Sequence, residues 1–195
     1  MTRQRLQEIL DGFEDLSILV VGDFFLDEYL ITDPALAEIS QETGLEAYQV
    51  IGRRCSPGAA GTVTNNLRAL EVGRVHALSV IGEDGNGYEL KKRLIESGVK
   101  TETLIETPDY STPTYTKPLV REASGEEREL NRLDIKNRHP MSADLEDRII
   151  ELSEVPSAAD VDFKRQAPGT WLLAQLPWTE ARHAIRAVGA KSAEA

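Results

Sequence analysis

Aliphatic runs and amphipathic segments alternate along the chain in the order expected of a parallel sheet covered by helices. Residues 17–22 and 75–81 predict two buried strands, because near-continuous apolar runs are typical of strands covered on both faces. Helices are predicted at 2–13, at 62–70 and at 88–98, where apolar residues recur at helical spacing. The order strand, helix, strand, helix indicates an α/β fold with right-handed crossovers.

The segments between these elements have a different pattern. Residues 46–51 favour a further strand, and the small residues at 56–61 (Ser-Pro-Gly-Ala-Ala-Gly) predict a loop that leads into a helix. From 101 to 134, β-favouring residues are interrupted by prolines, and a turn signal stands at 124–127. We expect an exposed β-hairpin there, which serves as a lid or an interface. Residues 140–154 again show helical spacing.

Two carboxylates follow the first predicted strand. Asp23 comes at its carboxyl end, and Asp27 is expected in the loop just beyond. Ligands of open α/β sheets bind outside the carboxyl ends of the strands. An ionised carboxylate only accepts hydrogen bonds and sugar hydroxyls donate them, so this pair suits a small polar ligand. Residues 18–27 are equally compatible with a buried strand that is simply followed by polar residues.

Composition narrows the class of protein. The 195 residues fit one domain, and a net charge of −11 disfavours nucleic acid and anionic membrane surfaces as partners. No apolar run approaches the ~20 residues of a membrane span, and the N-terminus lacks the features of a secretory signal. Cys55 is the single cysteine, and with His76, His139 and His183 it forms no metal-ligand spacing. We expect a cytoplasmic protein without a structural metal.

Six motifs follow one another between residues 18 and 134. They are Val20-Val21-Gly22-Asp23-Phe24-Phe25-Leu26-Asp27-Glu28-Tyr29, Ile39-Ser40-Gln41-Glu42, the loop and helix from Ser56 to Leu70, the turn from Val80 to Gly87, Thr114-Tyr115-Thr116-Lys117 and Asn131-Arg132-Leu133-Asp134. Together they resemble the carbohydrate kinases of the ribokinase (PfkB) superfamily, most closely its heptose 7-phosphate kinase branch. The resemblance implies a ribokinase-like three-layer αβα sandwich with a small β-hairpin lid. Residues 1–154 would be its N-terminal part, with lid segments at about 29–51 and 110–134.

The resemblance also implies an activity and a site. The activity is ATP-dependent phosphorylation of a sugar or sugar phosphate with Mg²⁺, with heptose 7-phosphate favoured, and a homodimer through the β lid is a further expectation. The implied substrate-binding residues are Asp23, Asp27, Gly58, Ala59, Thr62, Asn66, Lys117 and Arg132.

Several of these positions keep a second interpretation. Ala59 stands where the family has a second glycine and Thr62 where it has asparagine, which leaves fructose or a nucleoside open as substrate. Asn66 is equally a solvated helix residue and Lys117 a surface lysine. Arg132 is either a phosphate ligand or half of an ion pair with Asp134.

The last segment departs from the family. Residues 155–195 carry a net charge of +1 against −12 for the rest, and 158–169 contain no sustained apolar run. The catalytic Gly-Ala-Gly-Asp motif that the family places late in the chain does not occur. Gly189-Ala190-Lys191 matches only its first two residues and lacks the second glycine and the aspartate. We expect a frame change or truncation near 155 rather than a lineage-specific tail. The chain would then bind sugar weakly and be catalytically incomplete; the alternative is a non-catalytic sugar-binding or dimerisation module.

Overall fold

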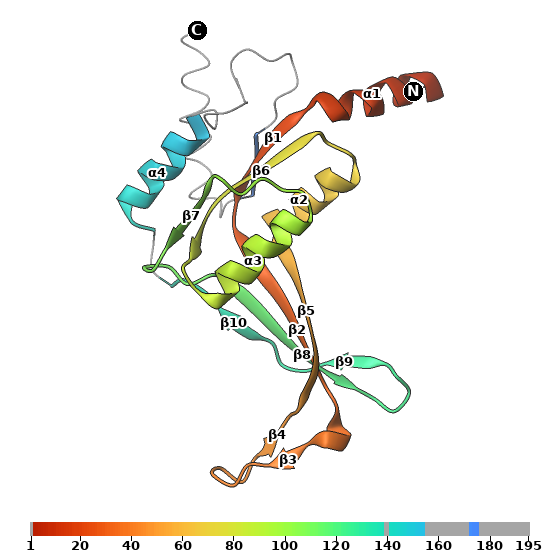
Figure 1. Ribbon diagram of the computed structural model, residues 1–195, viewed down its shortest axis with the longest axis vertical. Coiled ribbons are helices and arrows are strands. Elements are labelled where there is room, and N and C mark those ends of the chain that lie inside the picture. The colour runs from red at the N-terminus through yellow and green to blue at the C-terminus, as the bar shows by residue number, and fades with distance from the viewer. Residues whose placement is uncertain (1, 139–140, 155–171, 176–195) are drawn as a thin grey trace.

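The computed structural model describes residues 2–138, 141–154 and 172–175, and Figure 1 shows their arrangement. The helices are α1 (Arg3–Asp11), α2 (Ala60–Ala69), α3 (Gly85–Glu96) and α4 (Ala143–Glu154), with short 3₁₀ helices at Gly12–Asp15 and Pro34–Leu36. The strands are β1 (Ser17–Gly22), β2 (Phe24–Thr32), β3 (Glu38–Ile39), β4 (Glu46–Ala47), β5 (Val50–Ala59), β6 (Arg74–Gly82), β7 (Leu104–Thr107), β8 (Thr114–Arg121), β9 (Glu127–Glu129), β10 (Leu133–Ile135) and β11 (Leu172–Gln175).

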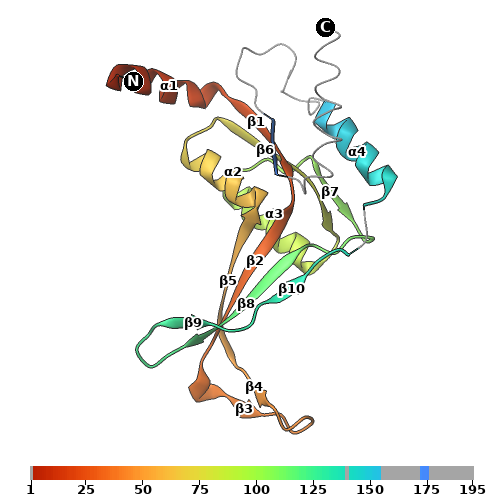
Figure 2. The ribbon, with the colours of Figure 1, turned by 180° about the vertical axis from the view of Figure 1, so that it is seen from behind.

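A parallel sheet with the order β11-β1-β6-β7 forms the central layer. Every residue of β1 is buried, which confirms the strand predicted from its apolar run. Alternate residues face opposite sides: Ile18 and Val20 pack in a cluster with α2 and α3, whereas Leu19 and Val21 contact the side of α4. Helices therefore cover both faces, and the predicted three-layer αβα arrangement is confirmed (Figure 2).

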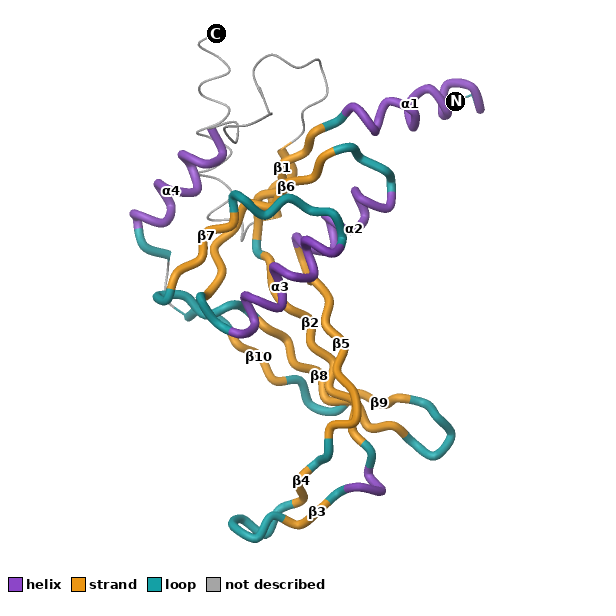
Figure 3. Tube along the Cα trace, in the orientation of Figure 1, coloured by secondary structure: helices purple, strands orange, loops and turns teal. Residues whose placement is uncertain are grey.

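A second sheet carries the lid. Its order is β10-β8-β2-β5, with β9 also paired to β8, and β2 runs parallel to β8 but antiparallel to β5. Figure 3 shows these strands leaving the helical layers, with the short β3–β4 pair at their far end. A single residue, Asp23, separates β1 from β2, so the chain passes directly from the central sheet into the lid sheet.

Two predictions about this region were wrong. Asp27 does not lie in a loop but within strand β2, and residues 56–59 are not a loop but the end of strand β5. Ser56 and Gly58 stand opposite Asp27 and Phe25 in the β2–β5 register. The small residues are therefore needed beside bulky neighbours in a sheet rather than in a turn. The predicted hairpin forms, but its return is divided into β9 and β10.

The two ends of the described chain differ from expectation in packing. The Thr2 hydroxyl caps α1 as predicted, accepting from the Arg5 N–H at 3.2 Å. The apolar face of α1 is nevertheless not buried, since Leu6 and Leu10 are 41% and 39% exposed. At the other end, β11 lies parallel to β1 inside the segment expected to diverge.

His139, His183 and most of residues 155–195 lie outside the described residues. Among those described, no helix is long and apolar enough to cross a bilayer.

Candidate functional site

Asp27 is held by a lysine on the neighbouring strand of the lid sheet. The Lys117 Nζ donates to Asp27 Oδ1 at 2.6 Å and to the Tyr29 hydroxyl at 3.2 Å, and both charged side chains are 17% exposed. Burial opposes the ammonium charge, but the hydrogen bonds to Asp27 and Tyr29 outweigh it and raise the pKa of Lys117 above its ordinary value. A carboxylate has about four lone-pair positions, so Asp27 keeps acceptor capacity for ligand hydroxyls.

Gly58 lies against the same carboxylate from the other side. A Cβ built on Gly58 would collide with the Phe25 ring and stand 2.5 Å from Asp27 Oδ2. The absence of a side chain is therefore what lets β5 approach Asp27 so closely. The next residue, Ala59, has φ 48° and ψ −112°, a region that L-residues rarely adopt. Glycine adopts this conformation without strain, which is a physical reason for the second glycine that the ribokinase-type motif has at this position.

The remaining predicted residues near α2 are placed at the end of the central strand. The Asp23 carbonyl accepts from the Ala60 N–H at 3.1 Å, which joins the strand end to the first residue of the helix. Thr62 and Asn66 are exposed and lie one turn apart on α2. The structure thus brings Asp27, Gly58 and Lys117 together, whereas Thr62 and Asn66 lie on the adjacent helix.

Arg132 takes the ion-pair alternative that its sequence left open. Its guanidinium is bidentate to Asp134, with Nε–Oδ1 at 2.6 Å and Nη2–Oδ2 at 3.0 Å, and it lies 4.2 Å from the centre of the Tyr115 ring. Lys136 contacts the same carboxylate at 3.0 Å. The hydrogen bond from Arg132, supported by that from Lys136, lowers the pKa of Asp134 to about 2. Tyr115 pairs with Asp27 in the β2–β8 register, so this cluster is next to the Asp27 position.

Sequence reasoning missed the aromatic residues of this face. Phe25 and Tyr115 lie with their ring centres 4.5 Å apart, and Tyr29 is contacted by Arg54 at 5.6 Å and by Lys117 at 4.7 Å. The available signal was the alternation in β2, where Phe25, Asp27 and Tyr29 are two residues apart and share one face. That signal was lost because the segment was interpreted as a loop.

No metal cluster marks this face in the described part of the chain. No group of three or more His, Cys, Asp or Glu side chains among the described residues is placed to hold a metal ion. A cavity of about 320 Å³ does occur, but it lies between α1 and the end of α2, where Leu10, Glu14 and Leu70 line it. The candidate site is therefore defined by the side chains of the lid sheet around Asp27 and not by that cavity.

Comparison with known proteins places this geometry in a class. No protein-family model matches the chain. The structure superposes on phosphofructokinase-2 from Escherichia coli in complex with fructose-6-phosphate with a TM-score of 0.54 and 18% identity, covering 89% of this chain and 51% of that one. The described fold is that of the ribokinase-like sugar kinases.

Sequence comparison narrows the relationship within that class. The chain is 34% identical over 152 residues to the bifunctional protein HldE of Trichlorobacter lovleyi, which covers 77% of this chain and 29% of that protein. It is 35% identical over 160 residues to HldE of Syntrophotalea carbinolica, covering 82% and 31%. The chain is homologous to the HldE proteins, and its resemblance to the heptose kinase branch is confirmed. It spans less than a third of the length of these curated relatives.

Proposed function

We propose that this chain supplies the sugar-binding face of an ATP-dependent carbohydrate kinase of the PfkB type, with heptose 7-phosphate as the favoured substrate. The observation that carries the proposal is the Asp27–Lys117 pair, held at 2.6 Å beside the glycine backbone at Gly58. A sugar ring needs fixed acceptors for its hydroxyls and a surface without side chains on which to lie. Asp27 provides the acceptors and Gly58 provides the surface.

The cations of this face favour a phosphorylated sugar over a neutral one. Arg132 and Lys136 share the single carboxylate of Asp134, which leaves this cluster with one excess positive charge. Lys117 is neutralised by Asp27, so in this proposal it orients the carboxylate. The phosphate contacts Lys136 and those of the five N–H donors of Arg132 that the bidentate pair with Asp134 does not use. An arginine fork and a lysine ammonium are both natural partners of phosphate oxygens.

The chemistry of the proposed reaction is phosphoryl transfer. The sugar hydroxyl oxygen bonds to the γ-phosphorus of ATP, ADP leaves, and the hydroxyl proton passes to a base, with Mg²⁺ offsetting charge on the phosphates. The sequence contains no Gly-Ala-Gly-Asp segment to supply the base that the family implies. The role proposed for Asp27, Lys117 and Arg132 is therefore substrate binding. The use of ATP and Mg²⁺ is proposed from the family resemblance and is assigned to no residue of this chain.

A second copy of the chain is the proposed partner of the lid. Its strands and hairpin expose large apolar side chains, among them Ile39 at 67%, Leu45 at 69% and Leu133 at 62%. In this proposal the second copy covers these side chains, because large exposed apolar surface is typical of association sites. Sedimentation velocity across a hundredfold concentration range is expected to show a dimer that Leu133→Lys weakens. A monomer at every concentration would contradict this part of the proposal.

Calorimetric titration tests the function directly. The protein is titrated separately with heptose 7-phosphate, fructose 6-phosphate and MgATP. We expect heptose 7-phosphate to bind and fructose 6-phosphate to bind more weakly. Binding of sugar phosphate without MgATP would favour the non-catalytic module, and binding of both would favour a kinase. Absence of any sugar phosphate binding by a folded chain would refute the proposal.

A further inference from the structure

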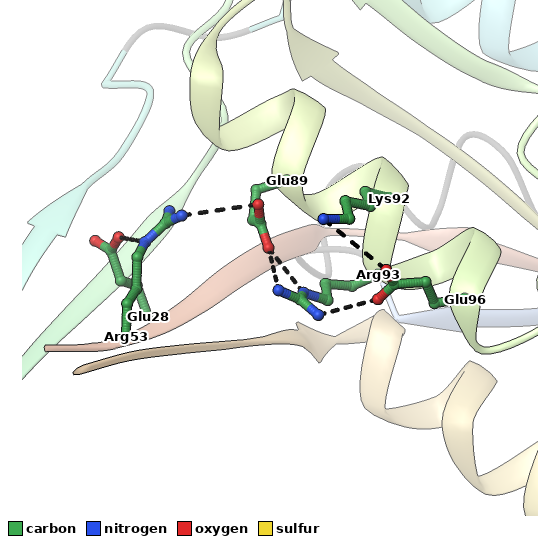
Figure 4. A network of polar contacts seen from close by, with 6 residues as sticks. All are labelled: Glu28, Arg53, Glu89, Lys92, Arg93 and Glu96. Carbon is green, nitrogen blue, oxygen red and sulfur yellow. Dashed lines mark hydrogen bonds and ion pairs between the residues drawn. The ribbon is translucent and has the colours of Figure 1, made fainter. Parts of the chain in front are cut away.

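A chain of ion pairs connects the back of the lid sheet to helix α3 (Figure 4). Arg53 of β5 bridges two carboxylates: its Nε lies 2.7 Å from Glu28 Oε1 of β2, and its Nη1 lies 3.7 Å from Glu89 Oε2 of α3. Glu89 is further fixed by Arg93, whose Nη2 lies 2.6 Å from Glu89 Oε1. The Glu28 and Glu89 side chains are only 14% and 11% exposed, whereas the Arg53 side chain that joins them is 44% exposed, so a cation at the surface bridges two largely buried carboxylates.

The bridge is attached directly behind the candidate site. Glu28 follows Asp27 in β2 and Thr116 precedes Lys117 in β8, and the Thr116 hydroxyl donates to Glu28 Oε2 at 2.7 Å. Neighbouring residues of a strand point to opposite faces. The Asp27–Lys117 pair on the front face therefore has a Glu28–Thr116 pair behind it, joined through Arg53 to α3.

We infer that Arg53 is a positioning residue that locks the lid sheet onto α3 and thereby fixes the direction of Asp27 and Lys117. Of the contacts in the bridge, Arg53–Glu89 is the one that crosses from the lid sheet to α3, and at 3.7 Å it is longer than the contacts on either side. The lid sheet and α3 also share the core cluster, which contains Leu26 of β2 and Leu90 and Leu94 of α3, and the Arg53–Glu89 ion pair adds a polar contact to this packing. The inference rests on the proposed function for its effect on binding, but the locking itself does not.

Cys55 provides a reporter for this lock. It is two residues after Arg53 on the same face of β5, it is half-buried, and it packs against the core cluster that includes α3. Burial raises the pKa of the Cys55 thiol, and the charge of Arg53 acts in the opposite direction. Because it is the only cysteine of the chain, alkylation by neutral iodoacetamide reports on this position alone.

The test compares Arg53→Met with a matched control, Lys91→Met. Lys91 is on α3, as Glu89 is, and forms an ion pair at 2.5 Å with Glu106 of β7 and not with the lid. Electrostatics alone predicts slower alkylation of Cys55 in Arg53→Met, because the loss of the positive charge raises the thiol pKa. Unlocking predicts the opposite sign: alkylation about fivefold faster or more, with Lys91→Met unchanged.

Two further measurements separate the possible outcomes. Hydrogen exchange should quicken in β2 and β5 but not in β1 and β6, and heptose 7-phosphate should bind Arg53→Met about fivefold more weakly. Alkylation that is unchanged or slower, exchange that rises equally in β1 and β6, or unaltered binding would overturn the inference. If heptose 7-phosphate does not bind the unmodified chain, the proposed function fails, and alkylation and exchange still decide whether Arg53 locks the lid.

Discussion

Replacing Gly58 by alanine is the sharpest perturbation of the candidate site. The added Cβ would overlap the Phe25 ring, lie 2.6 Å from Phe25 Cδ2 and lie 2.5 Å from Asp27 Oδ2, whereas real Cβ atoms essentially never come within 3.0 Å of other heavy atoms. Phe25 is braced by Tyr115 and Asp27 by Lys117, so neither moves without losing a contact. Overpacking of this kind costs about 1–3 kcal/mol.

The assay is urea unfolding followed by far-ultraviolet circular dichroism. With a slope of about 2 kcal/mol per molar urea, the middle of the usual range, Gly58→Ala should lower the midpoint by about 0.5–1.5 M. Gly12→Ala is the matched control, because nothing lies within 4 Å of its added Cβ and its φ is −76°. It should be neutral or stabilise the protein by up to ~1 kcal/mol. Coincident curves for Gly58→Ala and the unmodified protein would refute the packing argument.

Three further predictions concern neighbouring positions. Ala59→Gly should raise the free energy of unfolding by about 1 kcal/mol, because relief of ~1–3 kcal/mol of backbone strain exceeds the added chain entropy; a lower midpoint in urea would contradict this. Burial acts to raise the pKa of the Asp84 carboxyl, but hydrogen bonds from the backbone N–H groups of Gly87 and Thr112 hold it below its ordinary value. The ionised carboxylate therefore stabilises the folded state above about pH 4, and this stabilisation is lost as the pH falls through the lower pKa of the folded state. Asp84→Asn should therefore show a shallower loss of stability on acidification in urea titrations between pH 6 and 2.5, and parallel profiles would count against it. Lys117→Met should weaken heptose 7-phosphate binding about tenfold and cost about 1.5–3 kcal/mol of stability, because it leaves the Asp27 carboxylate without its partner; unchanged calorimetry would argue that the pair has no role in binding.

The central sheet was predictable because its signals are local. The unbroken apolar run of β1 and the helical spacing of Leu90 and Leu94 each depend on neighbours in sequence, and burial on both faces leaves no other interpretation. The apolar face of α1 was equally visible, but whether another element covers it depends on the tertiary structure. β11 was missed although Leu172 and Leu173 belong to an apolar run, because residues 155–195 were set aside as a whole for their departure from the family in charge and composition.

The candidate site was predictable by residue identity but not by geometry. The motifs selected Asp27, Gly58 and Lys117, yet the loops expected around them are strands β2 and β5. Pro57 and Gly58 indicate a turn when considered alone, and only the pairing with Phe25 across the sheet explains the glycine. The bridge through Arg53 joins residues far apart in sequence, so nothing in their spacing could announce it.

Calorimetric titration of the unmodified chain and of Asp27→Asn with heptose 7-phosphate decides whether the Asp27 carboxylate binds the sugar phosphate. The substitution keeps the shape of the side chain but removes the charge and one of its two acceptor oxygens. We expect measurable binding by the unmodified chain and a loss of about tenfold or more in Asp27→Asn, with the two urea unfolding curves confirming that both are folded. Equal affinity of the two folded proteins, or no binding by either, would contradict this expectation.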